Sequence, residues 1–159
     1  MIDQDGYRPN VCMVIVNRSG QVFWAKRARE NAWQFPQGGI DAKESTEAAL
    51  FRELKEETGL SGSSIDIIAV TRNWYRYRLP RRMLKNRSSI FVGQKQKWFM
   101  LRFKGEEGEF DLDYSGSPEF DGWQWVSYWY PVSQIVGFKK NVYSKALKEL
   151  APSLNKCMN

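Results

Sequence analysis

Three glutamates with helical spacing are the side chains of greatest chemical interest in this chain. Glu53, Glu56 and Glu57 occupy positions i, i+3 and i+4 of a run rich in helix-forming residues. At about 100° per residue, they share one side of an α-helix. Like charges placed so closely repel one another, and a hard divalent cation such as Mg²⁺ would offset that repulsion through oxygen ligands. The spacing suggests a metal site, with a solvated acidic surface as the alternative.

The helix that must carry these glutamates has both a start signal and a stop signal. Ser45 precedes the run and is typical of an N-cap, and Gly59 follows it and is typical of a C-cap. The pattern predicts a helix over Ser45–Thr58 whose buried face carries Leu50, Phe51 and Leu54. Before it, the sequence Gln-Gly-Gly over residues 37–39 predicts a flexible turn whose backbone can approach a metal or a phosphate.

Residues 38–60, GGIDAKESTEAALFRELKEETGL, resemble the signature of the Nudix hydrolase superfamily at every fixed position. The resemblance implies an α/β fold, a Nudix-type α/β/α sandwich with a mixed β-sheet and a loop-helix-loop catalytic motif. It implies binding of Mg²⁺ or Mn²⁺ and hydrolysis of a diphosphate linked to another group. It also implies that the Gly38 carbonyl supplies a backbone ligand to the metal.

Candidate ligands follow from carboxylate chemistry. Glu53 and Glu57, one helical turn apart, are the first choices, and Glu56 is the next. Glu44 is expected to orient the loop, or alternatively to be a helix-start charge that the helix dipole favours.

A fourth carboxylate, Glu119, lies in a loop just ahead of an expected strand. In the branch of the superfamily that this chain most resembles, described below, such a glutamate is associated with metal binding or with activation of water. The alternative is a solvated loop acid. The four catalytic candidates are therefore Glu53, Glu56, Glu57 and Glu119. The general base stays open between Glu56 and Glu119.

Length, charge and composition limit the number of domains and the kinds of substrate and chemistry that can be expected. The 159 residues predict a single domain over residues 1–159. The net charge of +6 around an acidic site suggests a polyanionic substrate such as a nucleic acid or nucleotide, although a merely soluble basic protein is the alternative. The chain has no histidine, which excludes histidine-based catalysis and histidine metal ligands.

The two cysteines form neither a disulfide framework nor a zinc site. Cys12 lies in an apolar run and is expected in the core, whereas Cys157 is expected near a loose end. The first residues lack an apolar signal region, and no stretch is long enough to span a membrane. We therefore expect a cytoplasmic monomer with no membrane partner.

Hydrophobic patterns and turn signals place the remaining elements. Strands are expected at Val11–Val16, Gln21–Lys26, Trp33–Pro36, Ile65–Tyr77, Lys97–Phe103 and Trp123–Val126. Loops are expected at Pro80–Gly93 and Gly105–Pro118, a short helical segment at Pro131–Val136, and a terminal amphipathic helix at Lys139–Leu150. Strands mixed with two substantial helices indicate a sheet covered on both faces.

Further stretches resemble a bacterial branch of the superfamily that acts on RNA, and the related diadenosine polyphosphate hydrolases. They are residues 7–11, 33–39, 71–74, 93–99, 118–125 and 126–131. The closer likeness is to the RNA enzymes, which implies removal of pyrophosphate from 5′-triphosphorylated RNA, leaving a 5′-monophosphate and initiating mRNA decay. Dinucleoside polyphosphates are the alternative substrates. A catalytically idle RNA-binding module is a third possibility, which the complete glutamate set disfavours.

Residue chemistry supplies candidates for substrate binding. Phosphate oxygens are expected to contact Arg8, Lys95, Lys97 and Lys139, with Gln94 and Gln96 as neutral donors. Guided by the resemblance, we expect a base to be held between Arg27, Val136 and Phe138. The alternatives are that Val136 and Phe138 belong to the core and that the lysines are surface residues. The loop from Pro80 to Arg87 gives no support to any substrate.

Overall fold

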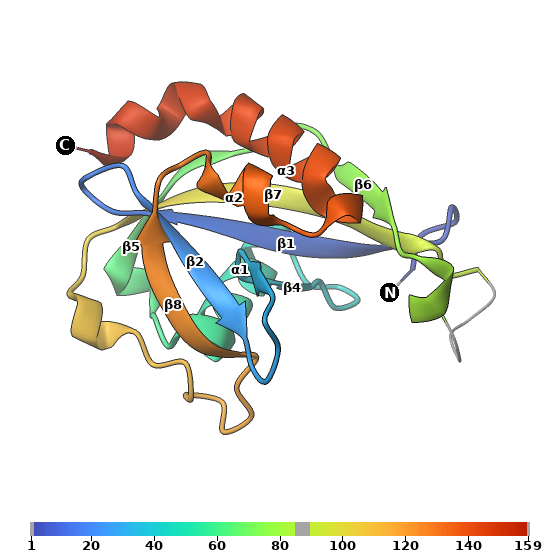
Figure 1. The fold of residues 1–159 in the computed structure, drawn as a ribbon, viewed down its shortest axis with the longest axis horizontal. Coiled ribbons are helices and arrows are strands. Elements are labelled where there is room, and N and C mark those ends of the chain that lie inside the picture. Colours follow the sequence, from blue (N-terminus) through green and yellow to red (C-terminus); the bar gives the residue numbers. More distant parts are fainter. Residues whose placement is uncertain (1, 85–89, 159) are drawn as a thin grey trace.

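A computed structural model describes residues 2–84 and 90–158. An eight-stranded mixed sheet forms its centre, and helices cover both faces (Figure 1). The strands are β1 (Tyr7–Val16), β2 (Val22–Arg27), β3 (Trp33–Gln34), β4 (Gln37–Gly39), β5 (Ile65–Val70), β6 (Tyr75–Arg78), β7 (Gly93–Phe103) and β8 (Phe120–Val126). The α-helices are α1 (Thr46–Thr58), α2 (Tyr130–Gln134) and α3 (Gly137–Leu150), and short 3₁₀ turns span Gly62–Ser64, Arg81–Met83, Glu107–Glu109 and Ala151–Cys157.

Strand β1 is buried on both of its faces. It runs parallel to β7, from Tyr7 opposite Gly93 to Val16 opposite Arg102, and antiparallel to β2 and β4. Alternate β1 side chains enter two separate cores, one beneath α3 and the other against α1. Burial on both faces explains why the sequence of β1 is a continuous apolar run rather than an alternating one.

The two long helices occupy opposite faces of the sheet, with α3 above and α1 below in Figure 1. Tyr143 and Leu147 of α3 pack into one core, and Leu50 and Leu54 of α1 pack into the other. This arrangement confirms the predicted α/β/α sandwich with a mixed sheet.

Helix α1 forms where its cap residues predicted. The Ser45 hydroxyl oxygen accepts a hydrogen bond from Ala48 N at 3.1 Å, and Gly59 ends the helix with φ of 78°. The prediction that Phe51 is buried with Leu50 and Leu54 was wrong, because Phe51 is 37% exposed. Its ring packs beside Gly62 of the following 3₁₀ turn instead of against the sheet.

Other boundaries differ because strand pairing outweighs local polarity. The stretch expected as one strand over Ile65–Tyr77 forms two strands, β5 and β6, which pair with different parts of β7. Strand β7 begins at Gly93 rather than Lys97, since its polar first half pairs with β1 on one side and β6 on the other. Strand β8 likewise begins at Phe120, where it pairs with β2.

The C-terminal segment is packed rather than loose. Cys157 ends the last 3₁₀ turn and is fully buried, and burial raises the pKa of its thiol to about 11. Cys12 lies in the core, as predicted. Of the expected loop over Pro80–Gly93, residues 81–83 form a 3₁₀ turn, and residues 85–89 lie outside the described residues. Within the described ranges, no helix is long and apolar enough to span a bilayer.

Candidate active site

Four glutamates predicted to be catalytic line one cavity of about 350 Å³. Glu53, Glu56 and Glu57 enter it from α1, and Glu119 enters it from the segment just before β8. Its other lining residues are Gln37, Gly38 and Gly39 of β4 together with Ser115 and Ser117. We call this space the acidic cavity. The tertiary fold therefore brings together two segments that are more than sixty residues apart in the sequence.

The carboxylates of the acidic cavity differ sharply in exposure. Glu57 is 8% exposed, and its Oε1 accepts a hydrogen bond from Gln37 N at 3.0 Å. Burial, and then the nearby Glu53 carboxylate, raise the pKa of Glu57 well above its usual range. Burial also raises the pKa of Glu53, against the opposing effect of its hydrogen bond with Arg52. In contrast, the side chains of Glu56 and Glu119 are about half exposed.

Arg52 joins the glutamate helix to the preceding loop. Its guanidinium donates to both carboxylate oxygens of Glu44 at 2.9 Å, to Gly39 O at 2.8 Å and to Glu53 Oε1 at 2.6 Å. The hydrogen bonds from Arg52, and then the hydrogen bond from the backbone N–H of Asp41, lower the pKa of Glu44 to about 2. Glu44 thus orients the loop, the role expected of it from the sequence.

Gly38 allows the Glu53 side chain to lie directly against β4. A Cβ atom at this position would lie 2.0 Å from Glu53 Cδ, far inside van der Waals contact. Any other residue would push the Glu53 carboxylate away from β4. The backbone of Gly38 can therefore border the same cavity as the helix carboxylates.

The donor set suits a hard divalent cation. Every carboxylate in the cavity is a glutamate, and Mg²⁺ and Mn²⁺ both prefer oxygen ligands. Over residues 2–84 and 90–158, no three acidic or cysteine side chains already converge closely enough to hold an ion. Glu53 instead faces Arg52, and Glu57 faces Gln37 N. The residues therefore fit the ion in kind.

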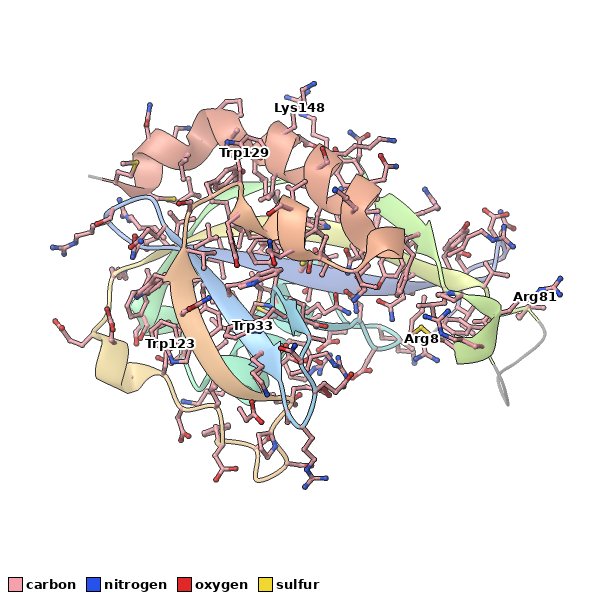
Figure 2. The ribbon with its side chains drawn as sticks, in the orientation of Figure 1. Arg8, Trp33, Arg81, Trp123, Trp129 and Lys148 are labelled. Atoms are coloured by element: carbon pink, nitrogen blue, oxygen red, sulfur yellow. The ribbon has the colours of Figure 1, made fainter. Side chains whose placement is uncertain are left out.

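A second and larger cavity, of about 840 Å³, lies beside α3 on the other side of the sheet. Gln37 lines both spaces, and Arg27 of the large cavity lies 3.9 Å from Glu119 of the acidic cavity. In Figure 2, Arg8 lies by the short helical turn after β6 and Trp33 lies by β2, and both residues line this large cavity. The large cavity thus extends across several strands and can hold a much longer ligand than the acidic cavity.

Six of the predicted substrate-binding residues line the large cavity: Arg8, Arg27, Gln94, Val136, Phe138 and Lys139. The Arg8 Nε atom is buried without a hydrogen-bond partner among the described residues. Burial lowers the pKa of Lys139, whose ammonium lies 5.6 Å from the centre of the Tyr77 ring. Val136 is 48% exposed and therefore not a core residue.

The structure does not bring the other three predicted residues to either cavity. Lys97 Nζ donates to the carbonyls of Thr71 and Arg72, and Lys95 Nζ pairs with Asp3 at 3.0 Å. Both lysines alternate along β7 with Gln94, so they point to the opposite face of the sheet. Gln96 is fully buried and donates to Asn10 and Gln37. This geometry gives their expected contacts with substrate no support.

Sequence reasoning missed several cavity residues. Ser115 and Ser117 bring hydroxyl groups to the acidic cavity, and Trp33 and Tyr77 bring aromatic rings to the large cavity. The only local signal was the small polar run that precedes Glu119. The aromatic residues resemble ordinary core residues in sequence, so nothing local distinguished them.

Comparison with known proteins identifies the class that this fold and site define. The family model described as NUDIX domain matches residues 6–150. The chain therefore belongs to the NUDIX family. Solved structures share its fold, including an E. coli dihydroneopterin triphosphate pyrophosphohydrolase, with a TM-score of 0.71, 15% identity, and coverage of 89% of this chain and 97% of that one. A C. elegans Ap4A hydrolase aligns with a TM-score of 0.66 and 17% identity, over 91% of this chain and 98% of that one.

Much more similar sequences carry one particular name. A protein of Stutzerimonas stutzeri named RNA pyrophosphohydrolase is 58% identical over 155 residues, or 97% of this chain and 98% of its own. A protein of Marinomonas sp. with the same name is 57% identical over 157 residues, or 98% of each chain. The similarity thus extends well beyond the glutamate helix.

Proposed function

We propose that this protein hydrolyses 5′-triphosphorylated RNA, releasing pyrophosphate and leaving a 5′-monophosphate, which initiates decay of the RNA. The observation that carries the proposal is the 58% identity, over nearly the full length of both chains, with a protein named RNA pyrophosphohydrolase. One water is consumed, the anhydride bond between the α and β phosphates breaks, and the released proton passes to a carboxylate or to solvent.

The chain offers one set of groups for each part of such a substrate. We assign a divalent metal, Mg²⁺ in the first instance, to Glu53, Glu56, Glu57, Glu119 and the Gly38 carbonyl. When bound, the metal neutralises phosphate oxygens and lowers the pKa of water. Glu56 and Glu119 have the exposed carboxylates and are the two candidates for accepting the proton of the attacking water.

The large cavity is assigned to the nucleotides that follow the triphosphate. Arg8 and Lys139 carry positive charge into it and suit phosphate oxygens, and Gln94 adds a neutral amide. Arg27 and Phe138 suit a base, because guanidinium planes and aromatic rings stack on nucleobases, and Val136 adds an apolar contact surface. The location of Gln37 on both cavities supports a substrate that passes from one to the other.

We further propose a single domain over residues 1–159 that acts as a monomer in the cytoplasm. Two free, buried cysteines among the described residues are compatible with a reducing compartment. Sedimentation at several protein concentrations tests the monomeric state, and a molecular mass that rises with concentration would contradict it.

Product analysis tests the function. The protein is incubated with Mg²⁺ and 5′-triphosphorylated RNA, and the RNA end and released phosphates are identified. Pyrophosphate with 5′-monophosphorylated RNA is the expected result. Diadenosine tetraphosphate is the competing substrate, and a higher kcat/KM on it than on RNA would reject the proposal. Replacing Mg²⁺ with Mn²⁺ at matched concentrations shows which ion supports the higher rate.

A further inference from the structure

The turn that joins β2 to β3 is fastened to the segment that carries Glu119. Ala28 N donates to Glu119 O at 2.9 Å, and Arg27 pairs with Phe120 after a bulge at the end of β2. Figure 1 shows β2 and β8 side by side, with this turn at the end of β2. Displacement of the turn would therefore move the backbone of Glu119 as well.

Asp121 makes the remaining fastening contacts. Its Oδ2 accepts from Arg29 N at 3.2 Å, and its Oδ1 pairs with Lys26 Nζ at 3.0 Å. Arg29 has a φ of 65°, a left-handed conformation that is unfavourable for a residue with a side chain. The Lys26 ammonium also donates to Arg27 O at 3.4 Å. A single carboxylate thus holds both sides of a strained turn.

This turn forms part of the wall of the large cavity and contacts Glu119 of the acidic cavity. Arg27 lines the large cavity. The edge of its guanidinium donates to Glu30 at 2.9 Å and to Gln34 at 3.4 Å, and it lies 3.9 Å from a carboxylate oxygen of Glu119. Contacts made by the edge of a guanidinium leave its faces available for stacking. Glu119 lines the acidic cavity, and the Arg27–Glu119 pair is therefore the charged link between the two spaces.

We propose that Asp121 is a positioning residue that acts through the turn after β2 to hold Arg27 and Glu119 in register across the two cavities. The proposal rests on the proposed function for the identity of the two sites. Asp121 lines neither cavity, so it has no route to the substrate except through the residues that it holds. Its side chain is 46% exposed, and exposed ion pairs contribute little to stability, so its variants should fold.

The test compares Asp121→Ala with wild type and with a matched control. Asp66→Ala is the control, because Asp66 is also a partly exposed strand aspartate that lines neither cavity. Its ion pairs are with Arg102 and Lys104, which lie outside the turn after β2. For Asp121→Ala we expect a raised KM for RNA, a lowered kcat, and about a tenfold loss in kcat/KM, since small misplacements of catalytic groups are costly. Mn²⁺ binding, followed by electron paramagnetic resonance without substrate, should also weaken. Asp66→Ala should behave as wild type in each measurement.

Double-mutant cycles identify the route of the effect. In a Glu119→Gln background, Asp121→Ala should cause no further loss of kcat or of Mn²⁺ affinity. In an Arg27→Ala background, it should cause no further rise in KM. Asp121→Asn, whose amide oxygen can still accept from Arg29 N, should keep part of the activity.

Two outcomes would overturn the proposal. One is a folded Asp121→Ala with wild-type kcat/KM and wild-type Mn²⁺ affinity. The other is an effect that multiplies with those of Glu119→Gln and Arg27→Ala, which would indicate independent action. If Asp121→Ala loses its fold, the same comparisons are made with Asp121→Asn. The rate of the wild-type protein on RNA tests the proposed function. The Mn²⁺ measurement uses no RNA, so it tests the positioning role of Asp121 separately.

Discussion

Arg52 is the residue that organises charge at the glutamate helix. It contacts Glu44 and Glu53 directly and lies 3.7 Å from carboxylate oxygens of Asp41 and Glu56. One guanidinium therefore offsets part of a dense negative charge before any metal binds. Because it is a single positive charge among several carboxylates, substantial repulsion remains for a divalent cation to relieve.

At this scale we expect Glu53→Gln to fold normally and to lose more activity than the roughly 10–100-fold typical of an outer-shell partner of a metal ligand. The amide keeps the shape of the side chain but removes a charge from the acidic cavity. Circular dichroism and pyrophosphate release are measured together at saturating Mg²⁺. Glu47→Gln, an exposed residue in the first turn of the same helix, serves as the control. Near-normal release by Glu53→Gln would contradict the metal assignment.

The lowered pKa of Glu44 predicts a specific pH dependence of folding stability. Its pKa is lowered by Arg52 to about 2 in the folded protein, from an ordinary value of 4.5. A carboxyl with a lowered folded pKa contributes stability above about pH 4.5, and that contribution is lost as the pH falls toward about 2. Thermal unfolding of wild type and Glu44→Gln across pH 2 to 7 should therefore show a Tm difference that shrinks in this window. A difference that stays constant with pH would show that charge is not responsible.

The elements matter because they turn local spacing into a defined cavity wall. Helix α1 stops at Gly59, where the backbone adopts a left-handed conformation and lies close to Asp111. A Cβ at Gly59 would lie 2.7 Å from Asp111 Cβ and O, in addition to the cost of its left-handed φ of 78°. The glycine therefore determines both the end of α1 and the approach of the later loop.

We expect Gly59→Ala to destabilise the fold by about 1–3 kcal/mol through backbone conformation, with a further cost from the contact with Asp111. Gly108→Ala is the matched control, because a Cβ there meets nothing within 4 Å. Urea unfolding measures both variants. Equal stability of the two variants would contradict both the backbone cost and the cost of the contact with Asp111.

Across the whole molecule, a basic chain surrounds an acidic cavity. The net charge of +6 should attract RNA, and each phosphate contact releases counterions, so binding should weaken with added salt. We expect kcat/KM for triphosphorylated RNA to fall with KCl more steeply than kcat/KM for a nucleoside triphosphate, which makes fewer contacts.

The lysines supply a matched pair for this experiment. Lys139→Met should flatten the salt dependence for RNA, because Lys139 lines the large cavity. Lys97→Met should leave the slope unchanged, because the Lys97 ammonium is bound to two backbone carbonyls outside both cavities. If kcat/KM depends equally on KCl for RNA and for the nucleotide, the basic surface contributes only to solubility, and a dinucleotide substrate is favoured.

Local spacing alone determined the glutamate helix. Ser45 and Gly59 mark its ends, and the i, i+3, i+4 rule places Glu53, Glu56 and Glu57 on one side of it. These relations depend only on neighbouring residues, so a sequence contains them completely. The same holds for the doubly buried strand β1, whose continuous apolar run indicates burial on both faces.

Only the tertiary structure decided which distant residues meet these elements. Gln94, Lys95, Gln96 and Lys97 look alike as a polar run, but the pleat of β7 directs alternate side chains to opposite faces. The sequence contains that alternation without saying which face borders a cavity. Glu119 meets the helix glutamates, and Asp121 meets the turn after β2, through the pairing of β8 with β2. Such pairing depends on the packing of the entire sheet, which no local pattern contains.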